Sequence, residues 1–423
     1  MKIIIVGAGL AGLVCGRTLL RAEHEVVLLE ASDGVGGRVR SDIVDGFTLD
    51  RGFQVLFTAY PAAKRQLDYQ RLDLRAFEPG AVIAQAARRA ILSDPLRDPR
   101  AFLPAVLTDI VSLADKLRTA LLSQEMLATS VDAIMESPDE TAEAFLRRRG
   151  FSERYLDNFI RPFFGGVFLD NSLQTSAKAF QFDWKMLSEG DTVVPARGIG
   201  QISEQLAEEL AAAHSIRLQC RVTEIVKSDG RVTGVRLHGG ETVDGDAVVV
   251  ATAAPEAARL TGQPMPEGQV GTVCLYFAGM KPMFPGRKIV LHANQNTFVN
   301  NVAPLTNVAP TLAPEGQHLL SASVLGVPPG EEAALYSRAF ADIKRMFAGD
   351  RAALAALAAY RPLAAYRIPY GQFAQPPGVY QTLPKNQTDL PGLYLAGEFT
   401  AASSLNAAMR SGEKCAAAII GAG

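Results

Sequence analysis

The sequence has few of the residues that build disulfide frameworks and metal sites. Its 423 residues include five histidines and four cysteines, namely Cys15, Cys220, Cys274 and Cys415. No two cysteines have C-x-x-C spacing and no histidine cluster accompanies them, so we expect neither structural disulfides nor a metal site. Cys15 and Cys274 fall in apolar segments, where a cysteine usually acts as a small buried hydrophobic residue.

Charge of one sign and long apolar runs are lacking as well. The formal net charge is −2, which gives no electrostatic basis for binding nucleic acid. The basic run 147–149 is short and precedes Gly150, so we interpret it as a solvated helix end. No apolar stretch reaches the roughly 18 residues that span a bilayer. Lys2 and the apolar run 3–14 imitate a secretion signal, but the glycines in that run argue against one. We therefore expect a cytoplasmic location.

What is present begins with those glycines. Gly7, Gly9 and Gly12 spell G-x-G-x-x-G directly after the β-branched run 2–6, which is typical of a buried strand. Good helix formers follow Gly12, and a second apolar run, 25–29, leads to an acidic residue at position 30. Strand, glycine turn, helix, strand and acid together predict a dinucleotide-binding βαβ unit.

Each part of this unit has a physical task. Gly7 allows the tight turn, Gly9 lets a pyrophosphate approach the backbone, and Gly12 lets helix and strand pack closely. The helix N-terminus offers unpaired N–H groups to the phosphates. Glu30 can accept hydrogen bonds from both ribose hydroxyls, and its charge disfavours a 2′-phosphate.

The residues that follow narrow the choice of dinucleotide. Gly36 and Gly37 permit a second close backbone approach, and the guanidinium of Arg38 can form a fork of hydrogen bonds to a phosphate. With this G-G-R string the sequence resembles the flavin amine oxidase superfamily, which includes amine oxidases, protoporphyrinogen oxidases and phytoene and zeta-carotene desaturases. That resemblance implies FAD. No cysteine lies near 370–373, so we expect the flavin to be bound non-covalently.

The strand pattern and the resemblance together imply an α/β fold with two interleaved domains. Strands typical of the cofactor domain occur in three separate places. We expect a discontinuous, Rossmann-like FAD-binding domain of the GR2 type from 1–60, 191–264 and 384–423. The remaining segments, 61–190 and 265–383, are expected to form an α+β substrate-binding domain that is largely helical over 96–165.

Further motifs extend the expected cofactor site. The segment 45–54 resembles the family's stretch along the flavin, and Val222 matches a valine whose backbone reads the adenine edge. The segment 393–412 resembles the family's C-terminal strand, Gly-Glu and helix, although residues 405–408 read L-N-A-A where the family usually has M-E-G-A. The full set expected to contact FAD is Gly7, Gly9, Leu10, Ala11, Gly12, Glu30, Ala31, Gly36, Gly37, Arg38, Gly52, Phe53, Gln54, Val222, Ala251, Gly397, Glu398, Leu405, Asn406 and Ala407.

The substrate side carries weaker signals. The segment 161–170 resembles a family loop at the roof of the substrate cavity, with a Gly-Gly hinge among phenylalanines, but an ordinary core explains it equally well. Amine oxidases usually carry a lysine where this chain has Thr272. His292 alone among the histidines falls in a plausible cavity strand, and a surface or core position is the favoured interpretation. Tyr370 and Gln54 are the candidate catalytic residues, with Phe53 beside them.

The expected chemistry is centred on the flavin. Flavin N5 accepts a hydride from an apolar or amphipathic substrate, and we favour desaturation or dehydrogenation. No second G-x-G-x-x-G unit is present to bind NAD(P)H, so oxygen or a quinone is the expected electron acceptor. An amine oxidase that releases hydrogen peroxide is one alternative. A flavoprotein without net redox, such as an isomerase or a binding module, is another. The segment 103–127 could supply an apolar face for peripheral membrane association.

Overall fold

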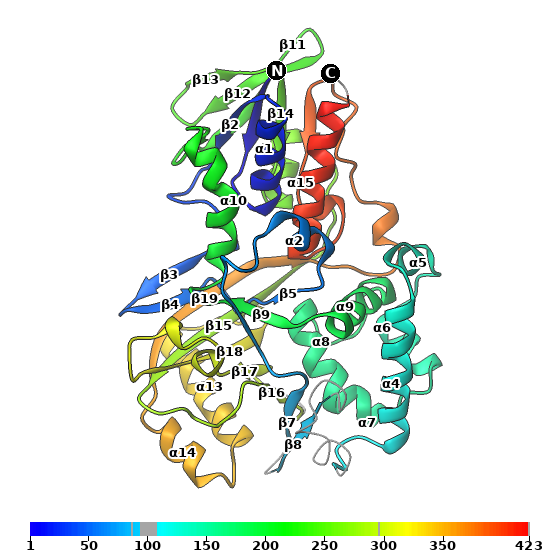
Figure 1. Ribbon diagram of the computed structural model, residues 1–423, viewed down its shortest axis with the longest axis vertical. Helices are drawn as coiled ribbons and strands as arrows, with labels where there is room; N and C mark the ends of the chain where they lie inside the picture. Colours follow the sequence, from blue (N-terminus) through cyan, green and yellow to red (C-terminus); the bar gives the residue numbers. More distant parts are fainter. Residues whose placement is uncertain (86–87, 94–107, 295–296, 422–423) are drawn as a thin grey trace.

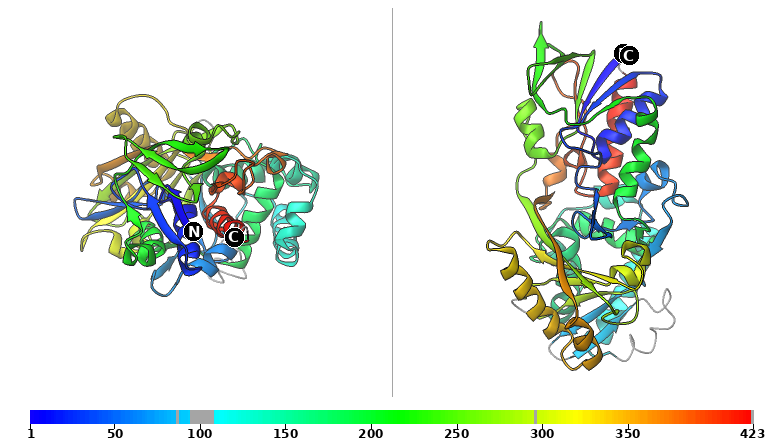
Figure 2. Two further views of the ribbon diagram at one scale, coloured as in Figure 1. Left: turned by 90° about the horizontal axis from the view of Figure 1, so that it is seen from above. Right: turned by 90° about the vertical axis from the view of Figure 1, so that its left-hand side faces the viewer.

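A computed structural model describes residues 1–85, 88–93, 108–294 and 297–421. The molecule is elongated, with both chain termini at the same end (Figures 1 and 2). A parallel sheet with its helices occupies that end. A larger, mostly antiparallel sheet and a group of helices lie side by side at the other end (Figure 1).

The parallel sheet contains the strands that the sequence places in the dinucleotide-binding unit. Its order is β10, β2, β1, β14 and β20, and all neighbours pair in parallel. These strands span Ile216–Arg217, Glu25–Leu29, Lys2–Val6, Ala247–Val250 and Leu393–Leu395. Successive residues of β1 pack into different hydrophobic clusters, because side chains alternate between the two faces of a strand. Both faces are therefore buried, as in doubly covered parallel sheets.

A different set of elements packs on each face of the parallel sheet. Helices α1 (Leu10–Arg21), α10 (Gly200–Ala212) and α15 (Leu405–Ile420) pack together on one face. The antiparallel strands β11 (Val222–Ser228), β12 (Arg231–Leu237) and β13 (Thr242–Asp244) cover the other, with α11 (Ala254–Thr261). The S-D-G sequence at 228–230 predicts a hairpin turn, and the pairing of β11 with β12 confirms it.

The fold class is confirmed, because strands from distant parts of the chain form one parallel sheet beside a mixed layer. The β2 and β14 strands that flank β1 lie more than 200 residues apart in the sequence. The division into 1–60, 191–264 and 384–423 against 61–190 and 265–383 stays a prediction.

The second sheet has seven strands in the order β19, β15, β18, β17, β16, β7 and β8. They span Arg361–Phe373, Gln269–Gly279, His318–Leu325, Asn301–Ala303, Ile289–His292, Ala81–Gln85 and Arg88–Leu92. Helices α13 (Glu332–Met346) and α14 (Arg351–Leu357) pack on one face of this sheet. The residue pattern predicts strands over 269–325 and helices over 331–358, and both are confirmed.

A helical layer stands beside that sheet. It contains α4 (Leu113–Ala128), α5 (Val131–Glu136), α6 (Ala142–Arg148), α7 (Glu153–Tyr155), the π-helical turn η2 (Leu156–Ile160), α8 (Arg161–Phe168) and α9 (Ala177–Glu189). The expected helical region 96–165 is found from residue 113 onward, and residues 94–107 lie outside the described residues. The expectation of a hinged loop at 161–170 is wrong, because residues 161–168 form helix α8 and their backbone is regular through both glycines.

Short elements join the two ends. Strands β3 (Ser41–Val44) and β4 (Phe47–Asp50) form a hairpin, and β5 (Leu56–Phe57), β9 (Thr192–Pro195) and β6 (Leu74–Ala76) form a small sheet. The remaining short helices are α2 (Pro61–Gln66), α12 (Leu305–Val308), η3 (Pro310–Leu312), η4 (Val379–Gln381) and η5 (Glu398–Thr400).

Several smaller expectations can be checked against the structure. Cys15 and Cys274 are buried free cysteines, as expected for small hydrophobic residues, and Cys415 is buried as well. Arg147 and Arg148 form ion pairs with neighbouring glutamates at the exposed end of α6, which confirms the solvated helix end. Among the residues with described structure, no helix combines the length and apolar character needed to cross a membrane.

Candidate active site

A cavity of about 1030 Å³ runs between the parallel sheet and the helical layer. Most of the residues predicted from sequence line it. Those on its wall are Gly7, Gly9, Leu10, Ala11, Glu30, Ala31, Gly36, Gly37, Arg38, Gly52, Phe53, Gln54, Val222, Ala251, Tyr370, Gly397, Glu398 and Leu405. Three predicted residues, Gly12, Asn406 and Ala407, are not part of the wall.

The three glycines after β1 occupy three different environments. Gly7 has a φ of +106°, a left-handed conformation that favours glycine, and an added Cβ would lie 2.8 Å from the Ala251 carbonyl oxygen. At Gly12 an added Cβ would overlap the carbonyl oxygen of Gly7, so glycine is needed there for close packing.

Gly9 is required by neither backbone conformation nor packing. Its φ of −73° and ψ of 175° suit any residue, and an added Cβ would meet no atom within 4 Å. The open space lies at the N-terminus of α1, on the cavity wall. A glycine here therefore leaves room for a bound group to approach the backbone.

The second glycine pair lies against this first turn. The Gly36 N–H donates to the Ala8 carbonyl over 2.7 Å, and Gly9 and Gly36 form an isolated parallel bridge. Glu30 is held beside them, since its two carboxylate oxygens accept from the backbone N–H groups of Ala8 and Ser32, each at 2.8 Å. Each of these oxygens retains capacity for a further hydrogen bond from a hydroxyl.

Arg38 connects the glycine loops to the C-terminal motif. One guanidinium nitrogen donates to the Gly371 carbonyl over 2.6 Å, and another pairs with Glu398. The guanidinium carbon also lies 5.1 Å from the centre of the Tyr370 ring. Burial by itself lowers the pKa of Arg38, but the charge of Glu398 and its hydrogen bond to Arg38 together outweigh burial, and the pKa is raised. Arg38 therefore remains a cation facing the cavity.

Three buried polar atoms of the cavity wall lack a hydrogen-bond partner among the described residues. They are Oε1 of Glu398, the hydroxyl oxygen of Tyr370 and Oγ of Ser403, and all three residues line the cavity. Buried polar atoms in native proteins nearly always have partners. Together with the open space at Gly9, they fit a large polar ligand with hydroxyl and phosphate groups at this end of the cavity.

The N-terminus of α15 contributes backbone more than side chains. Ser404 caps the helix by accepting from the Ala407 N–H over 3.1 Å. The Asn406 amide oxygen accepts from the Ala62 N–H over 2.9 Å, so this side chain faces α2 and not the cavity. Leu405 and Ala408 form the wall instead. Contact of Asn406 or Ala407 with a cofactor stays a prediction.

The side chain of Gln54 makes hydrogen bonds to nearby backbone carbonyl groups. Its amide nitrogen donates to the Arg38 carbonyl over 2.9 Å and to the Arg51 carbonyl over 3.2 Å. Beside it, the Phe53 ring meets Phe77 edge-on, with centroids 6.1 Å apart. Gln54 thus fixes the loop that carries Arg38, and its amide oxygen remains available to a ligand.

The far end of the cavity is lined by aromatic side chains. Phe159, Phe163 and Phe164 form a continuous series with centroids 5.4 and 5.3 Å apart. The Trp184 ring stacks on Phe164 at 5.8 Å. All four line the cavity. A wall of this kind accommodates the apolar part of a ligand.

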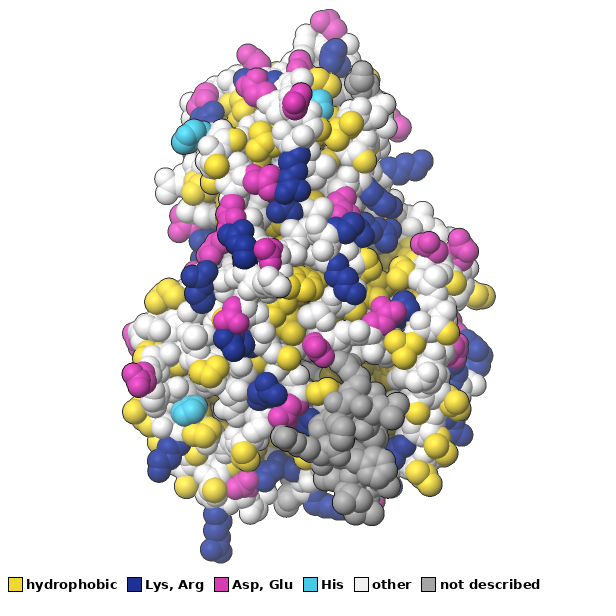
Figure 3. Space-filling view, viewed as in Figure 1, with side chains coloured by type: hydrophobic (Ala, Val, Ile, Leu, Met, Phe, Trp, Pro, Cys, Tyr) yellow, Lys and Arg dark blue, Asp and Glu magenta, His cyan; other side chains and the backbone are white. Residues whose placement is uncertain are grey.

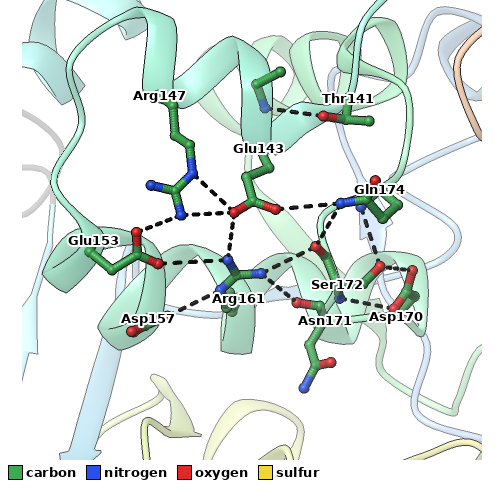
Figure 4. Close-up of polar contacts among 11 residues, drawn as sticks. Thr141, Glu143, Arg147, Glu153, Asp157, Arg161, Asp170, Asn171, Ser172 and Gln174 are labelled. Atoms are coloured by element: carbon green, nitrogen blue, oxygen red, sulfur yellow. Dashed lines mark hydrogen bonds and ion pairs between the residues drawn. The ribbon is translucent and has the colours of Figure 1, made fainter.

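A polar network holds α8, which carries part of this wall. Arg161 at its first turn pairs with Glu143 of α6 at 3.0 Å and with Asp157 at 3.1 Å, and donates to the Asn171 carbonyl over 3.3 Å (Figure 4). Arg147 shares the same Glu143 oxygen. The ion pairs fasten α6, η2, α8 and the segment after α8 to one another, so the aromatic wall is held from its outer side.

The two other residues considered from the sequence, Thr272 and His292, make contacts within the protein. Thr272 is on the cavity wall, and its hydroxyl donates to the Val324 carbonyl over 2.8 Å. His292 is a core residue whose Nδ1 lies 3.2 Å from the Val299 carbonyl oxygen, and burial lowers its pKa to about 4. Within the described part of the chain, no group of three or more histidine, cysteine or acidic side chains could hold a metal ion.

Sequence reasoning missed many polar residues of the wall, among them Tyr60, Asp183 and Ser403. Asp183 lies in the run F-Q-F-D-W, where one acidic residue stands between aromatic neighbours. That contrast with its neighbours was the available signal, because an acid on the apolar face of a helix calls for an explanation.

Comparison with known proteins places these features in a family. The family model described as flavin containing amine oxidoreductase matches residues 10–420. The chain is 27% identical over 288 residues to 4,4'-diapolycopene oxygenase from Methylomonas sp., covering 59% of this chain and 55% of that protein. It is 29% identical over 283 residues to a lycopene-forming phytoene desaturase from Pseudescherichia vulneris, covering 58% and 54%. The chain thus spans about half the length of these curated relatives.

Solved structures share the fold over the full length. Wild-type putrescine oxidase bound to putrescine superposes with a TM-score of 0.72 at 18% identity, covering 100% of this chain and 99% of that one. A likeness at this identity establishes the architecture and leaves the reaction open.

Proposed function

The chain belongs to the flavin-containing amine oxidoreductase family, and on that premise we propose that it is an FAD-dependent oxidoreductase that dehydrogenates or desaturates an apolar or amphipathic small molecule. One observation carries the proposal: a single cavity joins a glycine-built anion cradle with three partnerless buried polar atoms to an aromatic wall. The names of the carotenoid-related relatives agree with an apolar substrate.

The residues at the polar end divide the task of holding FAD. The N-terminus of α1 with Gly9 receives phosphate groups, and Glu30 accepts from ribose hydroxyls. Arg38, Glu398 and Ser403 offer a cation, an acceptor and a hydroxyl to the remaining polar groups. These contacts are non-covalent. When bound, FAD supplies a two-electron acceptor, and oxygen or a quinone takes the electrons afterwards.

The chain's own part in the reaction is binding, orientation and exclusion of water. The aromatic series from η2 to α8 packs along the apolar part of the substrate and keeps water from the reacting bond. Tyr370 and the Gln54 loop both line the cavity beside Arg38. Burial and the charge of Glu398 raise the pKa of Tyr370, so its hydroxyl stays protonated and can donate a hydrogen bond.

The first experiment is an anaerobic visible spectrum of the purified protein with amines, porphyrinogens and polyenes. We expect the bands of oxidised flavin, and bleaching by an apolar polyene-like or porphyrinogen substrate. Bleaching by primary amines, with hydrogen peroxide released in air, would instead favour the amine oxidase alternative. A flavin that no substrate bleaches, with activity only after chemical reduction, would favour a non-redox flavoprotein.

Replacing the two candidate catalytic side chains should separate their roles. Tyr370→Phe removes the partnerless hydroxyl, and we expect kcat to fall about 10-fold to 100-fold. Gln54→Ala frees the Arg38 and Arg51 carbonyls, and we expect weaker flavin retention as well as slower turnover. Steady-state kinetics and flavin content measure both effects. If both variants keep wild-type turnover and substrate affinity, the assignment fails.

We also propose peripheral membrane association through one face of α4. Leu113, Leu117 and Leu121 are 67%, 61% and 70% exposed, and their spacing of four places them on one side of the helix. Leu113 and Leu117 also line the cavity, so an apolar substrate could enter from the lipid. Figure 3 shows hydrophobic side chains among scattered charges over the helical layer at the lower right.

Replacing all three leucines by serine should weaken binding to phosphatidylcholine vesicles by about 100-fold, since each inserted leucine contributes about 1 kcal/mol. Vesicle co-sedimentation measures the loss. Leu218→Ser is the matched control, because Leu218 is 40% exposed beside β10 at the other end of the molecule. Absence of vesicle binding by the unmodified protein would remove this part of the proposal.

A further inference from the structure

One carboxyl group in the cavity has no partner among the residues that the structure describes. Asp183 lies in the middle of α9 on the cavity wall, and its exposed fraction is 7%. No hydrogen bond or ion pair joins its side chain to the described residues. The two lysines of the same helix make hydrogen bonds to other groups. Lys178 donates to the Met135 carbonyl, and Lys185 donates to the Met126 carbonyl.

The other strongly buried aspartates of the described chain are supplied with donors. Asp50 accepts from the Ser41 hydroxyl and the Ile199 N–H. Asp115 accepts from Ser152, and Asp342 from the N–H groups of Phe298 and Val299. Among the strongly buried aspartates of the described residues, Asp183 is the one that no hydrogen-bond donor contacts. A buried carboxyl without a partner is strongly unfavourable, so a protein retains one where it has a use.

The residues before and after Asp183 both carry stacked aromatic rings. Phe182 stacks on Tyr60 with centroids 6.1 Å apart, and Trp184 stacks on Phe164 at 5.8 Å. Asp183 thus lies at the seam where α9 joins the cofactor side to the helical layer. Burial raises its pKa to about 7. Tyr60 also lines the cavity and stacks on Phe182, the residue next to Asp183, and the Asp183 charge adds to the burial that raises the pKa of that tyrosine.

We propose that Asp183, with Tyr60 beside it, binds a polar hydrogen-bond donor, a hydroxyl or a protonated amine, carried by an otherwise apolar substrate. The inference rests on the proposed function, because it takes the ligand of the aromatic end to be the substrate. It makes that substrate amphipathic. The inference also fixes the orientation of the substrate in the cavity. The polar group of the substrate is held at Asp183, and its apolar part lies along Phe159 and Phe163.

The test uses three probes with the same chain and different head groups: n-octylamine, 1-octanol and octanoate. Trp184 is the one tryptophan of the chain and lines the cavity, so its fluorescence reports binding without reference to the flavin. With the wild-type holoenzyme we expect the donor probes to bind at least about 10-fold more tightly than octanoate. Calorimetry gives the same constants independently of fluorescence.

Two substitutions and one control complete the test. Asp183→Asn should weaken octylamine by about 10-fold, and Asp183→Leu should weaken both donor probes by at least as much. Glu189→Gln is the control, because it removes the same charge from the same helix at a residue paired with Lys185 and outside the cavity. The control should keep both affinities within about twofold of wild type.

The pH dependence of the binding affinity distinguishes an ammonium donor from a hydroxyl donor. An ammonium head group should bind more tightly as pH rises from about 6 to about 8, because Asp183 ionises in that range. The groups near Asp183 are Tyr60 and Tyr380, whose raised pKa values keep them neutral there. The affinity for octanol should stay nearly constant or fall.

The inference is overturned if both Asp183 variants bind octylamine and octanol within twofold of wild type, or if octanoate binds as well as the donor probes. Failure of the proposed function is a separate result. It would be seen as a protein that takes up no flavin, or a flavin that no substrate reduces, and the tryptophan titration remains readable in either case.

Discussion

Gly9→Val is expected to abolish FAD binding while the protein stays folded. The backbone at Gly9 has β-region angles that valine adopts, and no protein atom lies within 4 Å of the added Cβ. The branched side chain would fill the space at the N-terminus of α1 through which a pyrophosphate reaches the backbone. We expect the affinity for FAD to fall at least about 100-fold. The loss of stability should stay near about 1 kcal/mol, because valine is a poorer N-cap than glycine.

Gly12→Ala is the contrasting variant within the same motif. Its Cβ would overlap the carbonyl oxygen of Gly7, a backbone atom that cannot move without shifting the turn. We expect a loss of about 2–4 kcal/mol in the free energy of unfolding, with flavin binding impaired as a consequence. Urea unfolding and the ratio of flavin to protein absorbance measure the two variants. A Gly9→Val protein that retains stoichiometric FAD would contradict the cofactor assignment.

The stability of the protein should fall as pH rises through the range in which Asp183 ionises. Burial raises the pKa of this carboxyl from 3.8 to about 7, so between these values the native state binds more protons than the unfolded state. The free energy of unfolding therefore decreases with increasing pH over that range. Below about pH 4 both states are protonated and the penalty is absent. Above about pH 7 the full cost of the buried charge, about 4 kcal/mol, is present.

Asp183→Asn removes this dependence, because an amide does not ionise. The variant should gain stability relative to the wild type as pH rises, by up to about 4 kcal/mol between about pH 4.5 and about pH 8.5. Urea unfolding of both holoenzymes at several pH values gives the difference. Taking the difference in free energy of unfolding between the two proteins cancels the contributions of the other titrating groups, which both proteins share. A difference in stability that does not change with pH would rule out an ionising, partnerless Asp183.

The elements of the cofactor end could be predicted from the sequence because their signals are local. The strand at 2–6, the glycine turn, the helix after it and the hairpin turn at 228–230 are each encoded within a few residues. The helix at 161–168 was misread. Two adjacent glycines and a proline favour a loop locally, but Pro162 stands directly after the π-helical turn η2, in a helical run that is continuous over 153–168. Packing against Asn171 and Asn300 leaves little space at Gly165, which explains a glycine inside a helix.

Where side chains point could not be predicted in the same way. Asn406 belongs to a motif that suggests flavin contact, yet its amide oxygen is taken by the N–H of Ala62, 344 residues away in sequence. Arg38 and Glu398 are separated by 360 residues and meet in one ion pair. The cavity depends on such meetings, since its polar end draws on both terminal segments and its apolar end on α8 and α9.

The sequence by itself determined the family, the parallel βαβ unit and the three glycine positions, because turn conformation and strand periodicity are properties of neighbouring residues. Only the tertiary structure decided that Asp183 is buried without a partner and that Gly9 faces open space. Burial and the supply of hydrogen-bond donors depend on which distant segments pack together. A carboxylate on an amphipathic helix looks the same in sequence whether the fold turns it toward water or toward a cavity.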